Sequence, residues 1–194
     1  FRQVGKEAES IVLPLGVSFY TLQGAAAVID RWRAARKGEI TQDTPALDFF
    51  TFMTFFPQLV AGPIVRYGEM MPQLERINSS KPEVNAARGL TIFAVGLAKK
   101  VIVADYLAPV AGALFDSSAS PTMADAFLGS VAYTLQLYFD FSGYSDMAIG
   151  LGAMFGLAIP VNFLSPYKSS SFTEFWRKWH VTLSFWFRDY LYIP

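Results

Sequence analysis

A single imidazole is the candidate for chemistry in this chain. His180 lies in the segment SFTEFWRKWHVTLSFWFRDYLYIP, which covers residues 171–194, and it is the one histidine of the sequence. Imidazole titrates near neutral pH, so His180 could act as a general base that takes a proton from an acceptor hydroxyl. The alternative is a helix residue at a membrane interface that bonds to a neighbour and does no chemistry. Residue spacing leaves both interpretations open.

Two carboxylates, Asp140 and Asp146, lie in the otherwise apolar segment YFDFSGYSDMAIG, with Ser142 between them. An ionisable side chain near the centre of a bilayer costs about 2.5–3.5 kcal/mol on insertion scales, so such groups usually face a polar cavity or a partner. The three side chains could orient a histidine or line a substrate channel. The alternative is a short polar turn between helices, helped by Gly143, in which the acids are structural partners of Arg177.

The element that must position His180 is predicted to be one amphipathic helix over residues 172–194. Aromatic and apolar residues recur on one face at steps of three and four residues, and the other face carries a polar stripe. That stripe consists of Thr173, Arg177, His180, Ser184 and Arg188. Trp176, Arg177 and Trp179 are expected to position the helix or line a tunnel, and the alternative for each tryptophan is an interfacial anchor.

Composition favours an all-α, polytopic helical membrane protein. Apolar residues make up 53% of the chain and charged residues 16%, whereas soluble domains contain about 25% charged residues. Residues 10–29 and 147–167 carry no charge, and each segment has about the 20 residues needed to cross a bilayer. The alternative is a pair of buried helices in a large soluble protein.

The remaining segments predict further membrane elements. The basic loop at residues 30–39 is expected on the cytoplasmic side. Proline and glycine interrupt the apolar segment 49–65, which favours a re-entrant hairpin. A helix is expected over residues 86–104, either crossing the bilayer with Lys99 and Lys100 snorkelling or lying at the interface. The acidic stretch 105–125 suits an external loop, followed by a further span from about residue 126.

Several classes of function are excluded. A net charge of zero and the absence of a basic tract argue against a nucleic-acid partner. The chain has no cysteine, which excludes disulfides and thiolate nucleophiles, and one histidine excludes a multi-histidine metal site within the chain. We therefore expect no bound cofactor or metal. Because the sequence begins at Phe1 and stops at Pro194 after an aromatic helix, residues 1–194 are interpreted as an internal part of a single membrane domain, truncated at both ends.

Four stretches carry a resemblance to a known family. They are LPLGVSFYTLQ from Leu13, FFPQLVAGPIVRY from Phe55, LQLYFDFSGYSDMAIGLGAMFG from Leu135 and EFWRKWHVTLSFWFRDYLYIP from Glu174. Together they cover most of the chain. The sequence resembles the membrane-bound O-acyltransferase family, and within it the bacterial branch similar to alginate O-acetyltransferase and to the D-alanyl transfer protein of teichoic acid synthesis.

The resemblance implies a multi-pass protein of the bacterial inner membrane whose helices surround a tunnel. An acyl donor, such as acetyl-CoA or an acyl-carrier thioester, would arrive on the cytoplasmic side as co-substrate. The acceptor would be a hydroxyl of an exopolysaccharide such as alginate, or of a periplasmic relay protein. His180 falls on the histidine of the family's tryptophan–histidine pair. A second family histidine is expected beyond Pro194, so residues 1–194 alone are expected to be inactive.

The expected chemistry is acyl transfer. The hydroxyl would attack the thioester with His180 handling the proton, and tunnel dipoles would stabilise the oxyanion. Intramembrane acids and broken apolar segments are also typical of transporters and channels, which form one alternative. A catalytically inactive scaffold for another transferase is the other.

Overall fold

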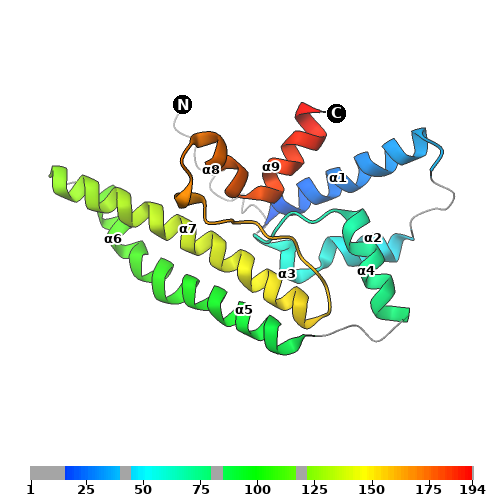
Figure 1. Cartoon of the computed structure of the whole chain (residues 1–194), viewed down its shortest axis with the longest axis horizontal. Coiled ribbons are helices and arrows are strands. Elements are labelled where there is room, and N and C mark those ends of the chain that lie inside the picture. The colour runs from blue at the N-terminus through cyan, green and yellow to red at the C-terminus, as the bar shows by residue number, and fades with distance from the viewer. Residues whose placement is uncertain (1–15, 40–44, 80–84, 117–121, 194) are drawn as a thin grey trace, which may run out of the picture.

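The computed structural model describes residues 16–39, 45–79, 85–116 and 122–193 of the chain (Figure 1). These residues form helices joined by turns and one extended segment, and no β-strand occurs among them. The expectation of an all-α fold is therefore confirmed.

The largest layer is a set of long helices packed along α7 (Met123–Met154). The chain runs through α5 (Ala86–Ala98), a π-helical turn η2 (Lys99–Ala104) and α6 (Asp105–Asp116), and all three pack on α7 (Figure 1). A capping box in which Thr122 and Asp125 exchange hydrogen bonds starts α7. The helix predicted over residues 86–104 is confirmed. The segment predicted as a span from about residue 126 is helical from Met123, and its crossing of a bilayer stays a prediction. The loop predicted from residue 105 is wrong, because the chain stays helical to Asp116.

Glycines allow α5 and α7 to approach until their backbones touch. Gly89 and Gly96 lie seven residues apart on α5, and Gly143 and Gly150 have the same spacing on α7, so each pair occupies one helix face. A Cβ atom on Gly96 would lie 2.6 Å from the carbonyl oxygen of Gly143, and one on Gly143 would lie 2.7 Å from the carbonyl oxygen of Gly96. No side chain larger than hydrogen fits at this crossing without moving the helices.

A second group of helices lies at the other end of α7 from α6 (Figure 1). It contains α1 (Val17–Arg36), α2 (Ala46–Thr54), the single turn α3 (Phe56–Leu59) and α4 (Tyr67–Ser79). Its core is apolar and includes the fully buried Phe52 together with Ala27, Val65, Met70, Met71 and Leu157. The basic residues after residue 30, predicted to lie in a loop, belong to the last turns of α1 instead.

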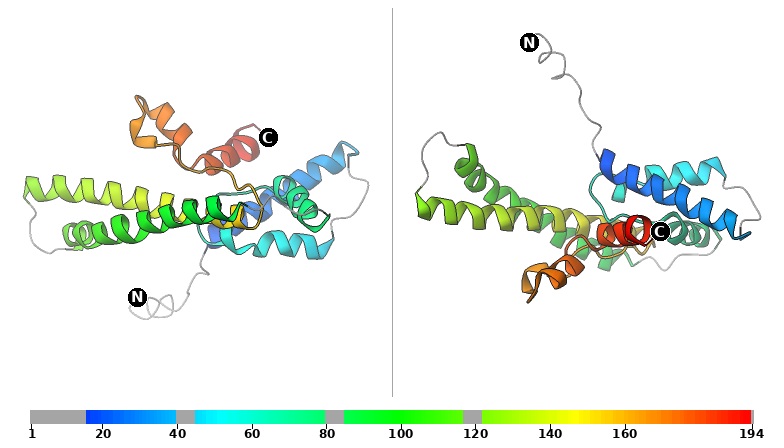
Figure 2. Two further views of the ribbon diagram at one scale, coloured as in Figure 1. Left: turned by 60° about the horizontal axis from the view of Figure 1, so that its bottom comes forward. Right: turned by 90° about the horizontal axis from the view of Figure 1, so that it is seen from above.

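The C-terminal segment folds over α7 as η3 (Pro166–Lys168), α8 (Phe172–Lys178), α9 (Val181–Phe187) and the π-helical turn η4 (Arg188–Tyr192). Figure 2 shows α8 and α9 on one side of the layer formed by α5 and α7. The chain reaches this position through residues 155–165, which leave α7 and run without regular helix.

The end of α7 contradicts the span predicted over residues 147–167. Gly156 adopts φ +78°, the N–H of Leu157 donates to the carbonyl of Gly152, and the N–H of Gly156 donates to the carbonyl of Ala153. These bonds form a Schellman motif, which closes a helix at a left-handed glycine. Pro160 then disfavours any return to helix. The segment lacks charge because much of it is packed, although it is not one continuous helix.

The structure tests part of the predictions for residues 10–29 and 49–65. Residues 10–15 of the predicted span 10–29 lie outside the described residues, and the remainder is helical from Val17. The break predicted in residues 49–65 is confirmed, since α2 ends at Thr54 and the short α3 begins at Phe56, with Pro57 in its first turn. No helix in the described part of the chain combines the length and the apolarity that crossing a bilayer requires. The multi-pass and re-entrant features stay predictions.

The C-terminal helices are fastened to α1 at several points. The Nε1–H of Trp186 donates to the carbonyl of Leu22 at 2.9 Å, and the hydroxyl of Tyr190 donates to Asp30 Oδ2. The guanidinium of Arg33 donates to the carbonyl of Asp189 at 3.1 Å and lies 5.3 Å from the centre of the Tyr190 ring. These contacts extend from the middle of α1 to its last turn.

Candidate functional site

The backbone breaks at His180, so the single helix predicted over residues 172–194 is wrong. Trp179 is extended, and His180 adopts φ 45° and ψ 56° in the left-handed region before α9 begins. A non-glycine residue in this region costs about 1–3 kcal/mol and persists only where its surroundings hold it. Such strain is concentrated at functional sites.

Hydrogen bonds to a distant segment hold this break in place. The N–H of Val181 donates to the carbonyl of Asn162 at 2.9 Å, and the N–H of Leu164 donates to the carbonyl of Lys178 at 3.0 Å. The side-chain periodicity of residues 172–194 carries no information about these bonds, because their partners lie in the extended segment after α7. That omission is why the helix prediction failed.

The His180 side chain is buried among aromatic rings instead of lying on a polar stripe. It is 7% exposed. Its ring centre lies 4.8 Å from that of Phe141 in an edge-to-face contact, and 6.1 and 6.3 Å from those of Phe19 and Phe163. Burial away from water disfavours the charged imidazolium and lowers the pKa of His180 to about 4. The ring is therefore neutral at physiological pH, as a general base must be.

Asn162 is the polar partner of this ring. It is fully buried, and its Oδ1 lies 3.0 Å from Nδ1 of His180. The same oxygen accepts hydrogen bonds from the hydroxyl of Thr182 at 2.9 Å and from the N–H of Thr182 at 3.3 Å. The Thr182 hydroxyl in turn accepts from the N–H of Ile64 at 3.0 Å. A continuous buried network thus joins the segment before α4, the segment after α7 and the start of α9.

Two of the residues predicted from the sequence lie on α8, and a third follows it. Trp179 lies next to His180 and packs in an aromatic cluster with Tyr138, Phe163, Tyr167 and Phe175. Trp176 is 59% exposed, and its carbonyl accepts a hydrogen bond from the hydroxyl of Ser184 at 3.1 Å. Arg177 is exposed. Of these three residues, the structure brings Trp179 closest to the imidazole.

The predicted carboxylates point to a different helix interface. Asp146 pairs with Lys99 at 2.5 Å, and Asp140 pairs with Lys100 at 2.6 Å. The ammonium of Lys100 also pairs with Asp105. The alternative of a polar turn with Arg177 as partner is wrong, because the segment lies inside α7 and its glycine serves the crossing with α5. Neither carboxylate is a hydrogen-bond or ring partner of His180. Ser142 is buried, and its Oγ has no hydrogen-bond partner among the described residues.

Asp146→Asn is expected to lower the free energy of unfolding by about 1 kcal/mol, because it leaves the half-buried ammonium of Lys99 without its counter-charge. Unfolding of the full-length protein in detergent measures this loss. In a double-mutant cycle with Lys99→Met, the second substitution should cost less than it does alone. Additive losses would show that the pair is not coupled. A loss of acyl transfer with no loss of stability would instead favour the orienting role predicted from the sequence.

The residues that contact His180 are mostly ones the sequence analysis did not select. The described contacts of the ring are with Phe19, Phe141, Asn162 and Phe163. Thr182 and Ser145 bond the Asn162 side chain, the latter at 3.4 Å. A usable signal existed for Asn162, which is the one amide side chain in the apolar stretch 147–167. The phenylalanines gave no such signal among 18 in the chain.

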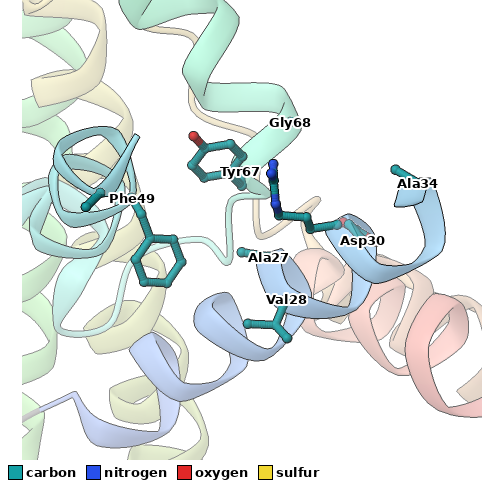
Figure 3. A pocket seen from close by; sticks show the side chains of 9 residues that line it. Ala27, Val28, Asp30, Ala34, Phe49, Tyr67 and Gly68 are labelled. Atoms are coloured by element: carbon teal, nitrogen blue, oxygen red, sulfur yellow. The ribbon is translucent and has the colours of Figure 1, made fainter. Parts of the chain in front are cut away.

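A cavity of about 510 Å³ lies elsewhere, between α1, α2 and the first turn of α4. Figure 3 shows Val28 and the rings of Phe49 and Tyr67 bordering this space. Asp30 and Arg31 supply charge to a lining that is otherwise largely apolar. None of the lining residues contacts His180, so the cavity is separate from the imidazole site. Within the described ranges, no three His, Asp or Glu side chains gather as a metal site would require.

The buried imidazole predicts a pH dependence of stability. Well above pH 6.5, His180 is neutral in both the folded and the unfolded chain. As the pH falls from 6.5 to about 4, the unfolded chain binds a proton that the folded chain does not, so the free energy of unfolding falls by up to about 3 kcal/mol. Urea unfolding of wild type and of His180→Gln at several pH values gives the two free energies of unfolding, and their difference isolates the contribution of His180. Carboxylates titrate over the same range in both proteins, so their contribution cancels. Parallel pH profiles would contradict it.

Comparison with known proteins places this arrangement in a family. Residues 6–194 match the membrane-bound O-acyltransferase family. The chain is 49% identical over 94% of its length to "Probable alginate O-acetylase AlgI" of Azotobacter vinelandii, and 44% identical over 97% to "Peptidoglycan O-acetyltransferase" of Helicobacter pylori. It is 28% identical over 92% to "Teichoic acid D-alanyltransferase" of Bacillus subtilis. The matches span 35%, 40% and 45% of these relatives' lengths. The chain belongs to the membrane-bound O-acyltransferase family.

Proposed function

We propose that the protein containing this chain is a membrane-embedded O-acyltransferase of the bacterial inner membrane. It transfers an acetyl or other short acyl group from a cytoplasmic thioester, such as acetyl-CoA or an acyl-carrier protein, to a hydroxyl on the far side of the membrane. The acceptor is an exopolysaccharide such as alginate, or a periplasmic relay protein. Family membership supports the reaction class, and the names of the relatives support a cell-surface polymer as destination.

The observation that carries the proposal is the state of His180. A strained backbone holds the imidazole, aromatic rings exclude water from it, and its low pKa keeps it neutral. A neutral imidazole can take the proton of an acceptor hydroxyl as the hydroxyl oxygen attacks the thioester carbonyl. The new C–O bond replaces the C–S bond, and the departing thiolate recovers a proton as thiol. Asp140, Ser142, Asp146, Trp176, Arg177 and Trp179 are retained in the proposal as residues that line or orient the route.

The test is transfer of a labelled acyl group by the full-length protein reconstituted in vesicles. With a radiolabelled acetyl thioester inside and a hydroxyl-bearing polymer or relay protein outside, label should appear on the acceptor as an alkali-labile ester. Movement of a solute without any acyl transfer would contradict the proposal and favour a transporter. If the protein transfers no acyl group by itself, but an added partner transferase becomes active in its presence, a scaffold role would be favoured.

A further inference from the structure

We infer that Asn162 is the positioning residue of His180: its side-chain carbonyl fixes the proton on Nδ1 and leaves Nε2 as the atom that accepts the proton of the acceptor hydroxyl. This inference rests on the proposed acyl transfer for its catalytic meaning. The geometry on which it depends belongs to the fold and can be tested without activity.

The orientation of the Asn162 amide follows from its other neighbours. The backbone N–H of Thr182 faces the Asn162 atom in contact with His180, and a backbone N–H can only donate. That atom must therefore be the oxygen, because a flipped amide would place two donors against each other. The Thr182 hydroxyl agrees with this assignment, since it accepts from Ile64 N–H and has its own proton left to donate to Asn162. On the far side, Nδ2 of Asn162 faces Ser145 Oγ.

The tautomer of His180 is then determined. An amide oxygen accepts but never donates, so the 3.0 Å contact is a hydrogen bond only when Nδ1 of His180 carries the proton. In a neutral ring, that choice makes Nε2 the unprotonated nitrogen. A base held in the other tautomer would present an N–H to the hydroxyl and could not accept its proton.

The Asn162 amide fixes the tautomer of His180 without placing a charge beside the ring. The described groups packed on the ring are Phe19 from α1, Phe141 from α7, and Phe163 and Asn162 from the extended segment, and Thr182 from α9 bonds Asn162 behind it. None of them ionises, and among the described residues no charged side chain shifts the pKa of His180. A carboxylate in place of Asn162 would also hold Nδ1–H, but it would stabilise the imidazolium. Asparagine thus selects the tautomer and keeps the ring easily deprotonated.

The experiment compares Asn162→Asp and Asn162→Leu with wild type in the full-length protein. The aspartate accepts from the same donors, so the ring should keep its proton on Nδ1 while its pKa rises. We expect the acid limb of the pH profile of kcat/KM to move up by about one pH unit or more, with transfer above that limb within about tenfold of wild type. Leucine removes the acceptor, and transfer should fall by on the order of 10²-fold, within the range that general bases contribute.

A readout independent of activity separates this inference from the proposed function. Nitrogen-15 spectra of histidine-labelled protein, with the His180 signal identified by its loss in His180→Gln, report which ring nitrogen carries the proton. Protonated Nδ1 in wild type and in Asn162→Asp is the expected result, and it stands even if no acyl transfer is found. Protonated Nε2 in wild type would overturn the inference. An Asn162→Asp protein with full activity and an unmoved acid limb would also overturn it, because Asn162 would then only hold segments together.

Discussion

His180→Gln in the full-length protein is expected to reduce acyl transfer by about 10²–10⁴-fold, the contribution that a general base makes to a proton transfer. Glutamine is polar and of comparable length, but its amide has no basic nitrogen that can accept the proton of a hydroxyl. The loss should appear in kcat, because the proton is transferred in the transition state, whereas binding of the donor involves no proton transfer. Initial rates with a labelled acetyl thioester measure it.

The control for this substitution is Lys168→Gln, which removes a charge at an exposed position in η3 and makes no change near the imidazole. It should transfer at the wild-type rate. Unfolding curves of both variants separate lost chemistry from lost structure. Transfer at the wild-type rate by a folded His180→Gln protein would remove His180 from the mechanism, and the alternative of a buried structural histidine would then stand.

Gly96→Ala is expected to lower the free energy of unfolding, because the added methyl group forces α5 and α7 apart. The new Cβ would lie 2.6 Å from the carbonyl oxygen of Gly143, 2.7 Å from the backbone nitrogen of Met147 and 3.0 Å from the Cβ of Asp146. Two of these three atoms are backbone, so no side-chain rotation relieves the clash and α5 must move away from α7. Overpacking of this kind costs about 1–3 kcal/mol.

A matched control exists on α4. Gly68 is also helical, and a Cβ there would meet nothing within 4 Å. Gly68→Ala should leave stability unchanged or raise it by about 0.4–1 kcal/mol, since alanine restricts the unfolded chain. Thermal unfolding of the two variants in the same detergent gives the comparison. Equal unfolding temperatures for Gly96→Ala and Gly68→Ala would show that the two long helices do not touch in the folded protein.

Elements whose causes are local could be predicted from the sequence. The helices over residues 86–104 and from about residue 126 follow from apolar periodicity and from caps such as Thr122 with Asp125. The early end of α7 was also readable, because Gly156 and Pro160 form a stop signal. The absence of charge over residues 147–167 favours a span by itself, but this stop signal ends the helix inside that segment.

The surroundings of His180 could not be predicted in the same way. Period and spacing predict that it lies on a polar stripe, whereas pairing with residues 162–164 turns the backbone and directs the ring inward. The carboxylates at 140 and 146 stand out in the sequence because charge is rare in apolar segments. Their direction in the fold depends on ion pairs with lysines 40 to 47 residues earlier in the chain, which spacing does not reveal. Family resemblance points to His180, whose catalytic role stays a prediction. It did not identify the amide that holds it.

The fastening of α9 and η4 to α1 bears on how the imidazole moves. Proteins open locally in cooperative units, and a segment with few anchors frays at little cost. The bonds from Trp186 to Leu22, from Tyr190 to Asp30 and from Arg33 to Asp189 would all have to break before the C-terminal helices could swing away. The His180 ring is thus carried by a segment whose local opening is coupled to that of a helix more than 150 positions earlier in the chain, so the two should open together.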